Sequence, residues 1–501
     1  MTAAKTSLVS PLDTTAAAPL YRQIYDRFRG AIDSGTLKPG DRVPSVRALT
    51  KELGLARGTI DAAYSLLAAE GYIQARGQAG TVVTPGLTLR PRAAGQAASH
   101  GGGQGAGQVR PHGTRRASNL APPPAGPLAD ATLATGLHAS AAVRPFQMGL
   151  PALDEFPRKL WARLGARCVR TLQPVDTTHS AVHGHPELRA RIAAYLQVSR
   201  GIDCTPEQVF ITSGYRHTLG TIAHALLKAG DQVCIEDPCY PPTRELLHHM
   251  QMQLMPVRVD GEGMRVSDAM TRAPRARAVV VTPAHQSPTC VTLSLPRRLA
   301  LLDWAVRNKA WIVEDDYDGE YRYASRPLSA LKSLDREGRV LYAGTFSKVL
   351  FPSLRLAYLV VPPAQVARFQ QVLQVFAGGS PQLTQAVVSA FMAEGHFARH
   401  IQRMRRLYAE RRDATAAGLA RVLGEHVEIE AQAGGMHLVL RLRHQQSDRE
   451  LVARMRAAGL SGEALTLWAR GRIAPALLLN FTNVASQASA EALGKRILAL
   501  L

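Results

Sequence analysis

One short segment of the chain, GTFSKVLFPSLR at residues 344–355, contains an amine, two hydroxyls and a guanidinium. Lys348 carries the amine, which can condense with an aldehyde when neighbouring charges lower its pKa. The hydroxyls of Thr345 and Ser347 can donate to a phosphate, and Arg355 can bind one with two hydrogen bonds at once. The segment therefore predicts a site that holds a phosphorylated aldehyde through a covalent bond to Lys348.

Other residues suit the ring and phosphate arm of a pyridine cofactor. Asp315 follows the apolar run WIVE, and a carboxylate buried there would need a cation such as a protonated ring nitrogen. Tyr317 lies two residues further on, so in an extended strand it points the same way and can reach a ring hydroxyl. Tyr240, in EDPCYP, can stack on the ring. Gly214 and Tyr215 open a helix after VFITS, where backbone N–H groups form an anion site.

Each residue alone has a simpler explanation, because a single SxK, a surface carboxylate or a packed tyrosine is common. The prediction depends on five motifs, SGYR, EDPCY, TPAHQ, EDDYD and GTFSK, that each follow a short apolar run. Such runs are typical of strands buried on both faces of a parallel or mixed sheet, which binds ligands at the carboxyl ends of its strands. The strands predicted for this α/β region, residues 141–501, are 208–214, 231–237, 277–283, 310–316, 339–347 and 354–362. After about residue 395 a smaller α+β unit is expected, with MHLVLRL and ALLLNF as strands.

Residues 1–84 predict a different fold. Apolar residues recur every four positions from Leu20 to Ile32, as on the buried face of a helix within residues 19–37. Further helices are predicted over residues 45–54, where Ser45 is the N-cap, and roughly 57–70. YIQARGQAGTVV then reads as a strand, a glycine-containing turn and a strand. Three helices and a hairpin predict a winged helix-turn-helix that binds double-stranded DNA.

Residues 85–140 contain GGGQGAGQ and APPPAGP and almost no large apolar side chains, so we expect a flexible basic linker. The net charge of +21 favours an anionic partner, although solvated helix faces such as RHIQRMRRLYAERR explain it equally well. No long apolar run or secretory pattern is present, so no membrane span is expected. The five cysteines form no close pair, which favours reduced thiols in the cytoplasm and argues against a metal site.

The order of the strand-end motifs resembles that of fold-type-I aminotransferases, which bind pyridoxal 5′-phosphate (PLP). EDDYD, GTFSK and PSLR, with TPAHQ upstream, are similar in particular to the aminotransferase-like domain of MocR-type regulators, a subgroup of the GntR family that includes vitamin B6 (PdxR-like) regulators. The resemblance covers nearly the whole chain apart from the linker. It implies that Lys348 binds the PLP aldehyde, Asp315 pairs with the pyridine nitrogen, Tyr317 contacts the ring oxygen and Tyr240 stacks on the ring. It also implies phosphate contacts from Thr345, Ser347 and Arg355.

The segment RVPSVRALTKELGLARGTIDAAYSLLAAEGYI resembles the DNA-reading motif of the GntR family. Arg47 lies on its first helix, and Arg57 and Thr59 lie at the start of its recognition helix, whose first residues reach base edges. Gly80, at the wing turn, lets the backbone approach the minor groove. Where the family often has serine before the recognition-helix arginine, this chain has Ala56, so one phosphate or cap contact is missing.

Departures from the family pattern bear on which small molecule the protein senses. Relatives that sense γ-aminobutyrate hold its carboxylate with two arginines, but this chain has Pro242 at one position and LLLNFTNV, with Asn480 and Asn483, at the other. A carboxylate without a cationic partner binds poorly in a closed site, so no γ-aminobutyrate response is expected. Ser287 replaces an aromatic residue and Cys290 a glycine, which predicts a more polar pocket. These changes fit a regulator that senses PLP itself.

Three functions remain open on the sequence. The favoured one is a cytoplasmic, homodimeric transcription factor whose aminotransferase-like domain senses PLP and shifts the arrangement of its winged helices. An active aminotransferase with an accessory DNA-binding head would keep the same Lys348 and Asp315, but the absent substrate arginines argue against it. In the third, PLP is purely structural in a repressor.

Overall fold

The computed structural model describes Leu12 and residues 19–75, 80–85, 143–178, 181–323, 329–376, 379–430, 434–443 and 446–501. Of the predicted linker, residues 85–140, only residue 85 is among the residues described. Within them, no helix is long and apolar enough to cross a membrane. The same residues contain no group of three or more His, Cys, Asp or Glu side chains arranged to hold a metal ion.

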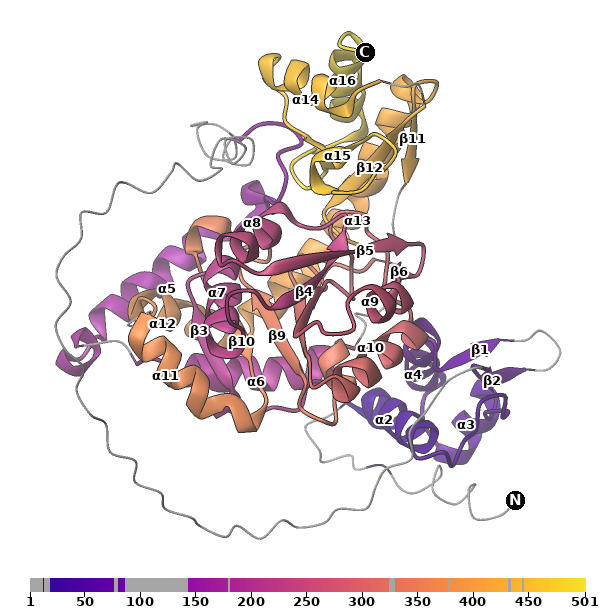
Figure 1. The fold of residues 1–501 in the computed structure, drawn as a ribbon, viewed down its shortest axis with the longest axis vertical. Helices are drawn as coiled ribbons and strands as arrows, with labels where there is room; N and C mark the ends of the chain where they lie inside the picture. The colour runs from indigo at the N-terminus through magenta and orange to yellow at the C-terminus, as the bar shows by residue number, and fades with distance from the viewer. Residues whose placement is uncertain are drawn as a thin grey trace.

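The N-terminal unit is a winged helix-turn-helix, drawn in indigo in Figure 1. Ser45 caps its second helix by accepting a hydrogen bond from Ala48 N at 3.1 Å, and Gly54 ends that helix in a left-handed conformation. Both features agree with the sequence, and the first helix lies within the range predicted for it. Its elements are α2 (Leu20–Asp33), α3 (Val46–Leu53), α4 (Arg57–Ala69), β1 (Ile73–Ala75) and β2 (Thr81–Val83).

An eight-stranded mixed sheet forms the centre of the large domain, in the order β3-β10-β9-β8-β7-β4-β5-β6. Only β10 and β6 run antiparallel to their neighbours. Every strand predicted for this sheet is present, while the last two strands in this order, β5 and β6, were not predicted. The strands are β3 (Val209–Thr212), β4 (Gln232–Asp237), β5 (Gln253–Asp260), β6 (Gly263–Met264), β7 (Ala278–Val281), β8 (Trp311–Asp316), β9 (Val340–Thr345) and β10 (Ala357–Val360).

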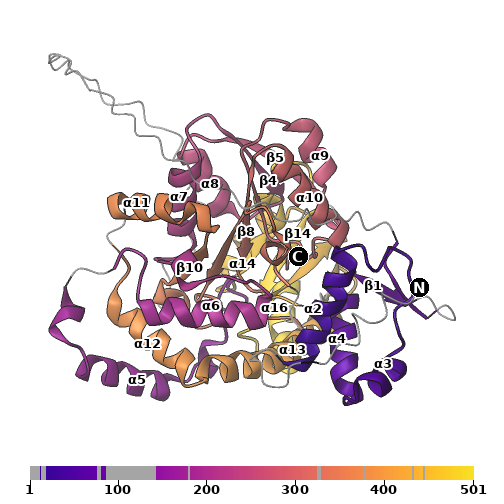
Figure 2. The same ribbon diagram turned by 90° about the horizontal axis from the view of Figure 1, so that it is seen from below.

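Helices cover both faces of this sheet (Figure 2). Val313 of β8 packs in the core under α7, α8 and α11, whereas its neighbour Ile312 packs in the core under α9 and α10. Because α5, α6 and α12 cover the rest of the second face, the strands are apolar on both sides, as the sequence predicted. These helices are α5 (Arg158–Arg170), α6 (Pro186–Arg200), α7 (Tyr215–Leu226), α8 (Pro241–His249), α9 (Val266–Arg272), α10 (Leu295–Arg307), α11 (Val366–Phe376) and α12 (Gln382–Ala393).

The C-terminal part forms the expected smaller α+β unit, drawn in yellow in Figure 1. Its antiparallel sheet has the order β11-β12-β14-β13, and the long helix α13 leads into it. Leu438 and Leu479 are buried in one core with Leu419 of α13. The elements are α13 (His396–Leu423), β11 (Val427–Glu430), β12 (His437–Leu442), α14 (Asp448–Ala457), β13 (Glu463–Ala464), α15 (Leu465–Trp468), β14 (Ala476–Asn480) and α16 (Gln487–Leu498).

The winged helix packs on the large domain beside α10 (Figures 1 and 2). Leu295 of α10 is buried in the apolar core of the winged helix. Glu70 accepts hydrogen bonds from the backbone N of Ser329 at 2.9 Å and from the hydroxyl of Tyr25 at 2.5 Å. Arg29 donates to the backbone oxygen of Ser333. The head is thus joined to the segment that leads into the 3-10 helix η7 (Leu331–Leu334).

Candidate functional site

The five polar motifs meet at one edge of the large sheet, because β3, β4, β7, β8 and β9 all run in the same direction. Asp315 lies near the end of β8, and Lys348 lies in the turn that follows β9. Asp315 interacts electrostatically with both Lys348 and Tyr240. Arg355 also interacts electrostatically with Tyr240. The structure therefore brings the predicted amine, carboxylate, aromatic ring and guanidinium together.

Lys348 is held by a backbone carbonyl, because its Nζ donates to the oxygen of Gly149 at 2.9 Å. Burial lowers the pKa of Lys348, and the nearby carboxylates of Asp318 and Asp315 only partly offset this effect. A lowered pKa favours the neutral amine, the form that attacks an aldehyde.

Gly149→Ala should therefore destabilise the protein. Gly149 has a φ of 78°, which strains any other residue, and an added methyl group would collide with Nζ of Lys348. We expect the free energy of unfolding to fall by about 1–3 kcal/mol, measured by denaturant titration. Gly165→Ala is the matched control, because Gly165 lies in α5 with nothing within 4 Å of the new methyl, so it should be neutral or stabilising. Equal effects of the two variants would contradict the close contact with Lys348.

Asp315 is a buried carboxylate, 7% exposed. Burial raises the pKa of its carboxyl well above the usual range, the charge of Asp316 adds to this shift, and a hydrogen bond from Tyr215 opposes it. Among the described residues, none forms an ion pair with Asp315. A protonated pyridine nitrogen would supply the counter-charge, so Asp315 and Lys348 fit the cofactor that the sequence implies.

Gly214 and Arg355 lie together at the start of α7. Gly214 has a φ of 100°, and a methyl group there would lie 3.8 Å from the guanidinium carbon of Arg355. The first N–H groups of α7 and this guanidinium can bind the same anion. Thr345 Oγ1 accepts a hydrogen bond from the backbone N of Ser347 at 3.1 Å, which shapes the turn before the lysine.

Tyr240 packs between two other aromatic rings. Its ring centroid lies 6.0 Å from that of Tyr215 and 5.7 Å from that of Trp468 in α15. The hydroxyl of Tyr215 lies 2.8 Å from Thr243 Oγ1, and Tyr215 also interacts with the carboxyl of Asp315. The sequence suggested only a backbone role for Tyr215, so its contact with the carboxylate is new.

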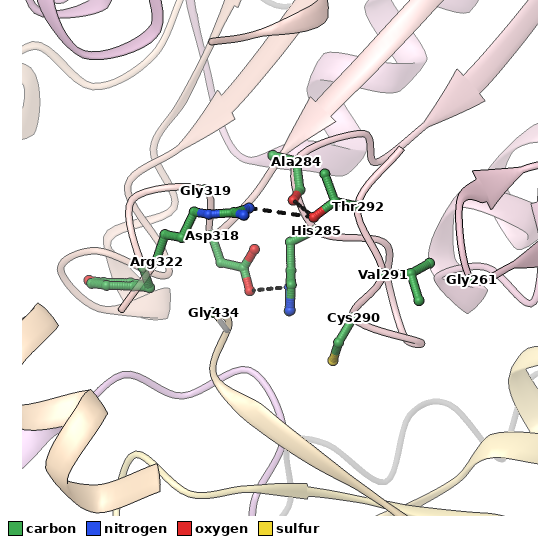
Figure 3. Close-up of a pocket in the computed structure, with 11 residues that line it drawn as sticks. Gly261, Ala284, His285, Cys290, Val291, Thr292, Asp318, Gly319, Arg322 and Gly434 are labelled. Atoms are coloured by element: carbon green, nitrogen blue, oxygen red, sulfur yellow. Dashed lines mark hydrogen bonds and ion pairs between the residues drawn. The ribbon is translucent and has the colours of Figure 1, made fainter. Parts of the chain in front are cut away.

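Tyr317 contacts polar side chains that the sequence analysis did not assign. Its hydroxyl lies 3.0 Å from His285 Nδ1, and an interaction with Ser287 opposes the rise that burial causes in the pKa of Tyr317. Burial alone would lower the pKa of His285, but Asp318, whose Oδ2 is 3.1 Å from the same nitrogen, raises it well above its usual value. Figure 3 shows His285 and Asp318 on the wall of a cavity of about 140 Å³. His285 belongs to the motif TPAHQ and Asp318 to the motif EDDYD. Membership of these motifs was the only indication in the sequence that they lie at the site.

The two asparagines that replace an arginine hold the loop that contacts Lys348. Asn480 Nδ2 donates to the carbonyls of Gln147 and Leu150, both at 2.8 Å. Asn483 Nδ2 donates to the carbonyl of Pro151 at 3.2 Å. These amides are used within the protein, and they position the carbonyl of Gly149.

The predicted DNA-reading residues lie on the winged helix. Arg47 and Arg57 are exposed, whereas Thr59 is half-buried one turn into α4. Gly80 has a φ of 79°, and a methyl group there would lie 3.2 Å from the guanidinium of Arg42. Arg42, which the sequence analysis did not assign, thus places a cation against the wing.

Arg57→Ala should weaken DNA binding without lowering stability. Its side chain is 80% exposed and, among the described residues, pairs with Asp61 alone, at 3.4 Å, an ion pair that contributes about 0.3–0.5 kcal/mol. Loss of a base contact should cost about 1–3 kcal/mol, and loss of a phosphate contact should lower the salt slope of binding by about 1. Fluorescence anisotropy with promoter DNA over a salt series measures both, with exposed Arg170→Ala on α5 as control. Equal binding by the two variants would remove Arg57 from the interface.

Comparison with known proteins gives the family. Residues 171–480 match the family described as aminotransferase class I and II, and residues 20–83 match bacterial regulatory proteins of the gntR family. The probable rhizopine catabolism regulatory protein MocR of Rhizobium meliloti is 37% identical, over 91% of this chain and 88% of its own. The chain belongs to the MocR-type subgroup of the GntR family of transcriptional regulators.

Two further comparisons agree with this assignment. The pyridoxine biosynthesis transcriptional regulator PdxR of Corynebacterium glutamicum is 30% identical, over 83% of this chain and 82% of its own. The solved structure of kynurenine aminotransferase from Pyrococcus horikoshii superposes with a TM-score of 0.66 at 25% identity, covering 77% of this chain and 96% of that one. The family and fold class predicted for this MocR-type regulator are confirmed, and PLP is the cofactor of the fold that its large domain adopts.

Proposed function

We propose that this MocR-type regulator is a cytoplasmic, homodimeric transcription factor that binds DNA half-sites through its winged helices and responds to PLP. The observation that carries the proposal is a buried amine, Lys348, near a buried carboxylate, Asp315, that forms no ion pair with any described residue, in a chain with a GntR head. The PdxR relative supports genes of vitamin B6 synthesis as targets, with amino-acid metabolism as the other candidate.

Each residue of the proposed site holds one part of PLP. PLP supplies an aldehyde that reacts with an amine and a ring nitrogen that binds a proton. Lys348 would bind the aldehyde carbon, Asp315 the ring nitrogen, Tyr317 the ring oxygen and Tyr240 the ring face. The phosphate would be held by Gly214, Tyr215, Thr345, Ser347 and Arg355.

Strand β8 connects this site to the docked head. Asp315 faces the site, whereas the carboxylate of its neighbour Glu314 accepts hydrogen bonds from the backbone N of Leu331 at 2.7 Å and of Lys332 at 2.8 Å. These residues begin η7, and Ser329 just before it binds Glu70 of the head. A shift of β8 on cofactor binding would move the docking segment through these bonds and change the population of docked heads.

Glu70→Ala should uncouple DNA binding from PLP. The substitution removes the acceptor for both Ser329 N and the Tyr25 hydroxyl, which should cost the docked state about 1–3 kcal/mol. A PLP effect on DNA affinity of about 5- to 150-fold should then shrink toward onefold while PLP absorbance stays normal. Glu52→Ala, an exposed carboxylate on α3, should retain the full effect. A full PLP response in Glu70→Ala would contradict the proposed route.

A footprint on the protein's own promoter and the neighbouring genes, with and without PLP, tests the function. A PLP-dependent change in protection or affinity supports it. Identical affinity in both conditions would favour the repressor with structural PLP. Steady turnover of an amino donor and a 2-oxo acid by the purified protein would favour the aminotransferase.

The homodimer is supported by large apolar side chains exposed on three helices of the large domain. Val169 of α5, Leu383 of α12, and Val375 and Phe376 of α11 are all exposed, and α5 packs against α12. Exposed apolar groups of this kind mark protein interfaces. Sedimentation should therefore give a dimer, and a monomer at micromolar concentration would contradict this part of the proposal.

A further inference from the structure

A buried thiol lies in the cavity beside Tyr317. Cys290 is 4% exposed and lines the cavity with His285 and Asp318 (Figure 3). Its Sγ lies 3.2 Å from Nε2 of His437 on β12, and the same nitrogen lies 2.9 Å from the carbonyl oxygen of Pro288. Because a carbonyl oxygen only accepts, Nε2 of His437 carries a hydrogen and can also donate to the sulfur.

The charges around Cys290 favour the thiolate. Burial alone would raise the pKa of Cys290, yet the positive charges of His437 and His285 lower it below its usual value. His285 is held as an imidazolium by Asp318. Burial instead raises the pKa values of the other cysteines, which are Cys168, Cys204, Cys234 and Cys239.

His285 provides an independent sign of a ligand. Its side chain is more than nine-tenths buried, yet Nε2 has no hydrogen-bond partner within the part of the chain that the structure describes. Its other ring nitrogen is engaged by Asp318 and Tyr317. Figure 3 shows the side chains of His285 and Cys290 extending in the same direction. A cavity of about 140 Å³, lined by both Cys290 and His285, has room for a small polar molecule within reach of the sulfur and of Nε2.

We propose that Cys290 is a peroxide-reactive thiol and that this cavity is where the peroxide binds. The thiolate sulfur attacks one oxygen of hydrogen peroxide, so an S–O bond forms as the O–O bond breaks. Sulfur loses two electrons to the peroxide, and the leaving hydroxide takes the proton from Nε2 of His285 and departs as water. The product is a sulfenic acid on Cys290.

The surroundings of Cys290 favour a sulfenic acid that persists. Its apolar neighbours are Val439, Leu465 and Trp468, and no other described cysteine belongs to this cluster. Without a second thiol in contact, the sulfenic acid cannot condense to a disulfide within the site. A cyclic 1,3-diketone should therefore capture it.

The test uses full-length, PLP-loaded protein, hydrogen peroxide, a cyclic 1,3-diketone and mass spectrometry of each cysteine. Cys290 should be labelled at least about tenfold faster than Cys168 and Cys204, although both are more exposed. From neutral pH to about 8.5, its rate should stay flat while theirs rise. Faster labelling of Cys168 or Cys204 than of Cys290 would overturn the proposal.

Two variants separate the roles of the histidines. His285→Gln should slow labelling of Cys290 about tenfold or more, because the proton donor to the leaving hydroxide is lost. His437→Gln should instead restore a rate that rises with pH, because the thiolate loses its neighbouring charge. Cys204→Ser, at a residue that does not line the cavity, should leave the rate at Cys290 unchanged. Unaltered Cys290 kinetics in both histidine variants would also refute the proposal.

Discussion

Lys348→Ala should give a folded regulator that no longer binds PLP covalently. The visible absorbance of lysine-bound PLP should vanish, and the affinity for PLP should fall at least about 100-fold, or about 2.7 kcal/mol. The fold should survive because the lost amine is buried and makes one hydrogen bond, to Gly149, which offsets little of the cost of burying it. Absorbance spectroscopy, PLP titration and circular dichroism measure these three quantities.

Lys332→Ala is an informative control because the side chain of Lys332 is also buried but stabilises the fold. Its Nζ donates to the carbonyl of Val340 at 2.6 Å and lies 3.9 Å from Asp335. This variant should lose stability and keep the covalent absorbance, the reverse of Lys348→Ala. Exposed Lys495→Ala should change neither property. An unchanged spectrum in Lys348→Ala would remove Lys348 from the site.

Much of the fold could be predicted because its determinants are local. The central strands are short apolar runs bounded by polar motifs, and the cap at Ser45 and the end at Gly54 depend on neighbouring residues. The predicted site residues could be grouped for the same reason, since parallel strands bring their ends to one edge. Strand β5 was missed because most of its residues are exposed or half-buried and only Val257 is buried, unlike the buried central strands.

The remaining parts depend on contacts between distant segments. Nothing near Glu70 in the sequence indicates that it binds the backbone of Ser329, and nothing near Asn480 indicates that it holds the loop of Gly149. The thiol of Cys290 meets His437 across 147 positions of sequence. Single-sequence patterns carry no information about such pairs, so these contacts appear only in the structure.

Asp315→Asn should weaken PLP binding and stabilise the apoprotein. Asparagine keeps an oxygen for the Tyr215 hydroxyl but cannot balance a protonated ring nitrogen, so PLP binding should lose about 3–5 kcal/mol, more than 100-fold. Without PLP, the native carboxylate is buried and uncompensated, and removing its charge removes that cost. Titration with PLP and thermal unfolding of the apoprotein measure the two effects.

The stability difference should depend on pH. The folded pKa of Asp315 lies above its unfolded value, so its protonated form stabilises the fold at pH below 3.8, and this contribution is lost as pH rises through the folded pKa. The two apoproteins should therefore be similarly stable in acid, and Asp315→Asn should gain relative stability as the pH rises toward neutral. Saturating PLP should reverse the order, because it supplies the cation that only aspartate can pair with.

Asp316→Asn is the matched control for Asp315→Asn, because the neighbouring carboxylate of Asp316 is already paired with a cation, Arg200. Asp316 Oδ2 lies 2.6 Å from Nε of buried Arg200 and accepts from the Tyr342 hydroxyl, also at 2.6 Å. Neutralising it leaves that guanidinium with Glu320, at 3.2 Å, as its one anionic partner among the described residues, and should destabilise the apoprotein by about 3–5 kcal/mol. Two neighbouring, equally buried aspartates should thus respond to the same substitution with opposite signs. If Asp315→Asn also destabilised the apoprotein, its carboxylate would already have a partner, and its place opposite the PLP ring nitrogen would be lost.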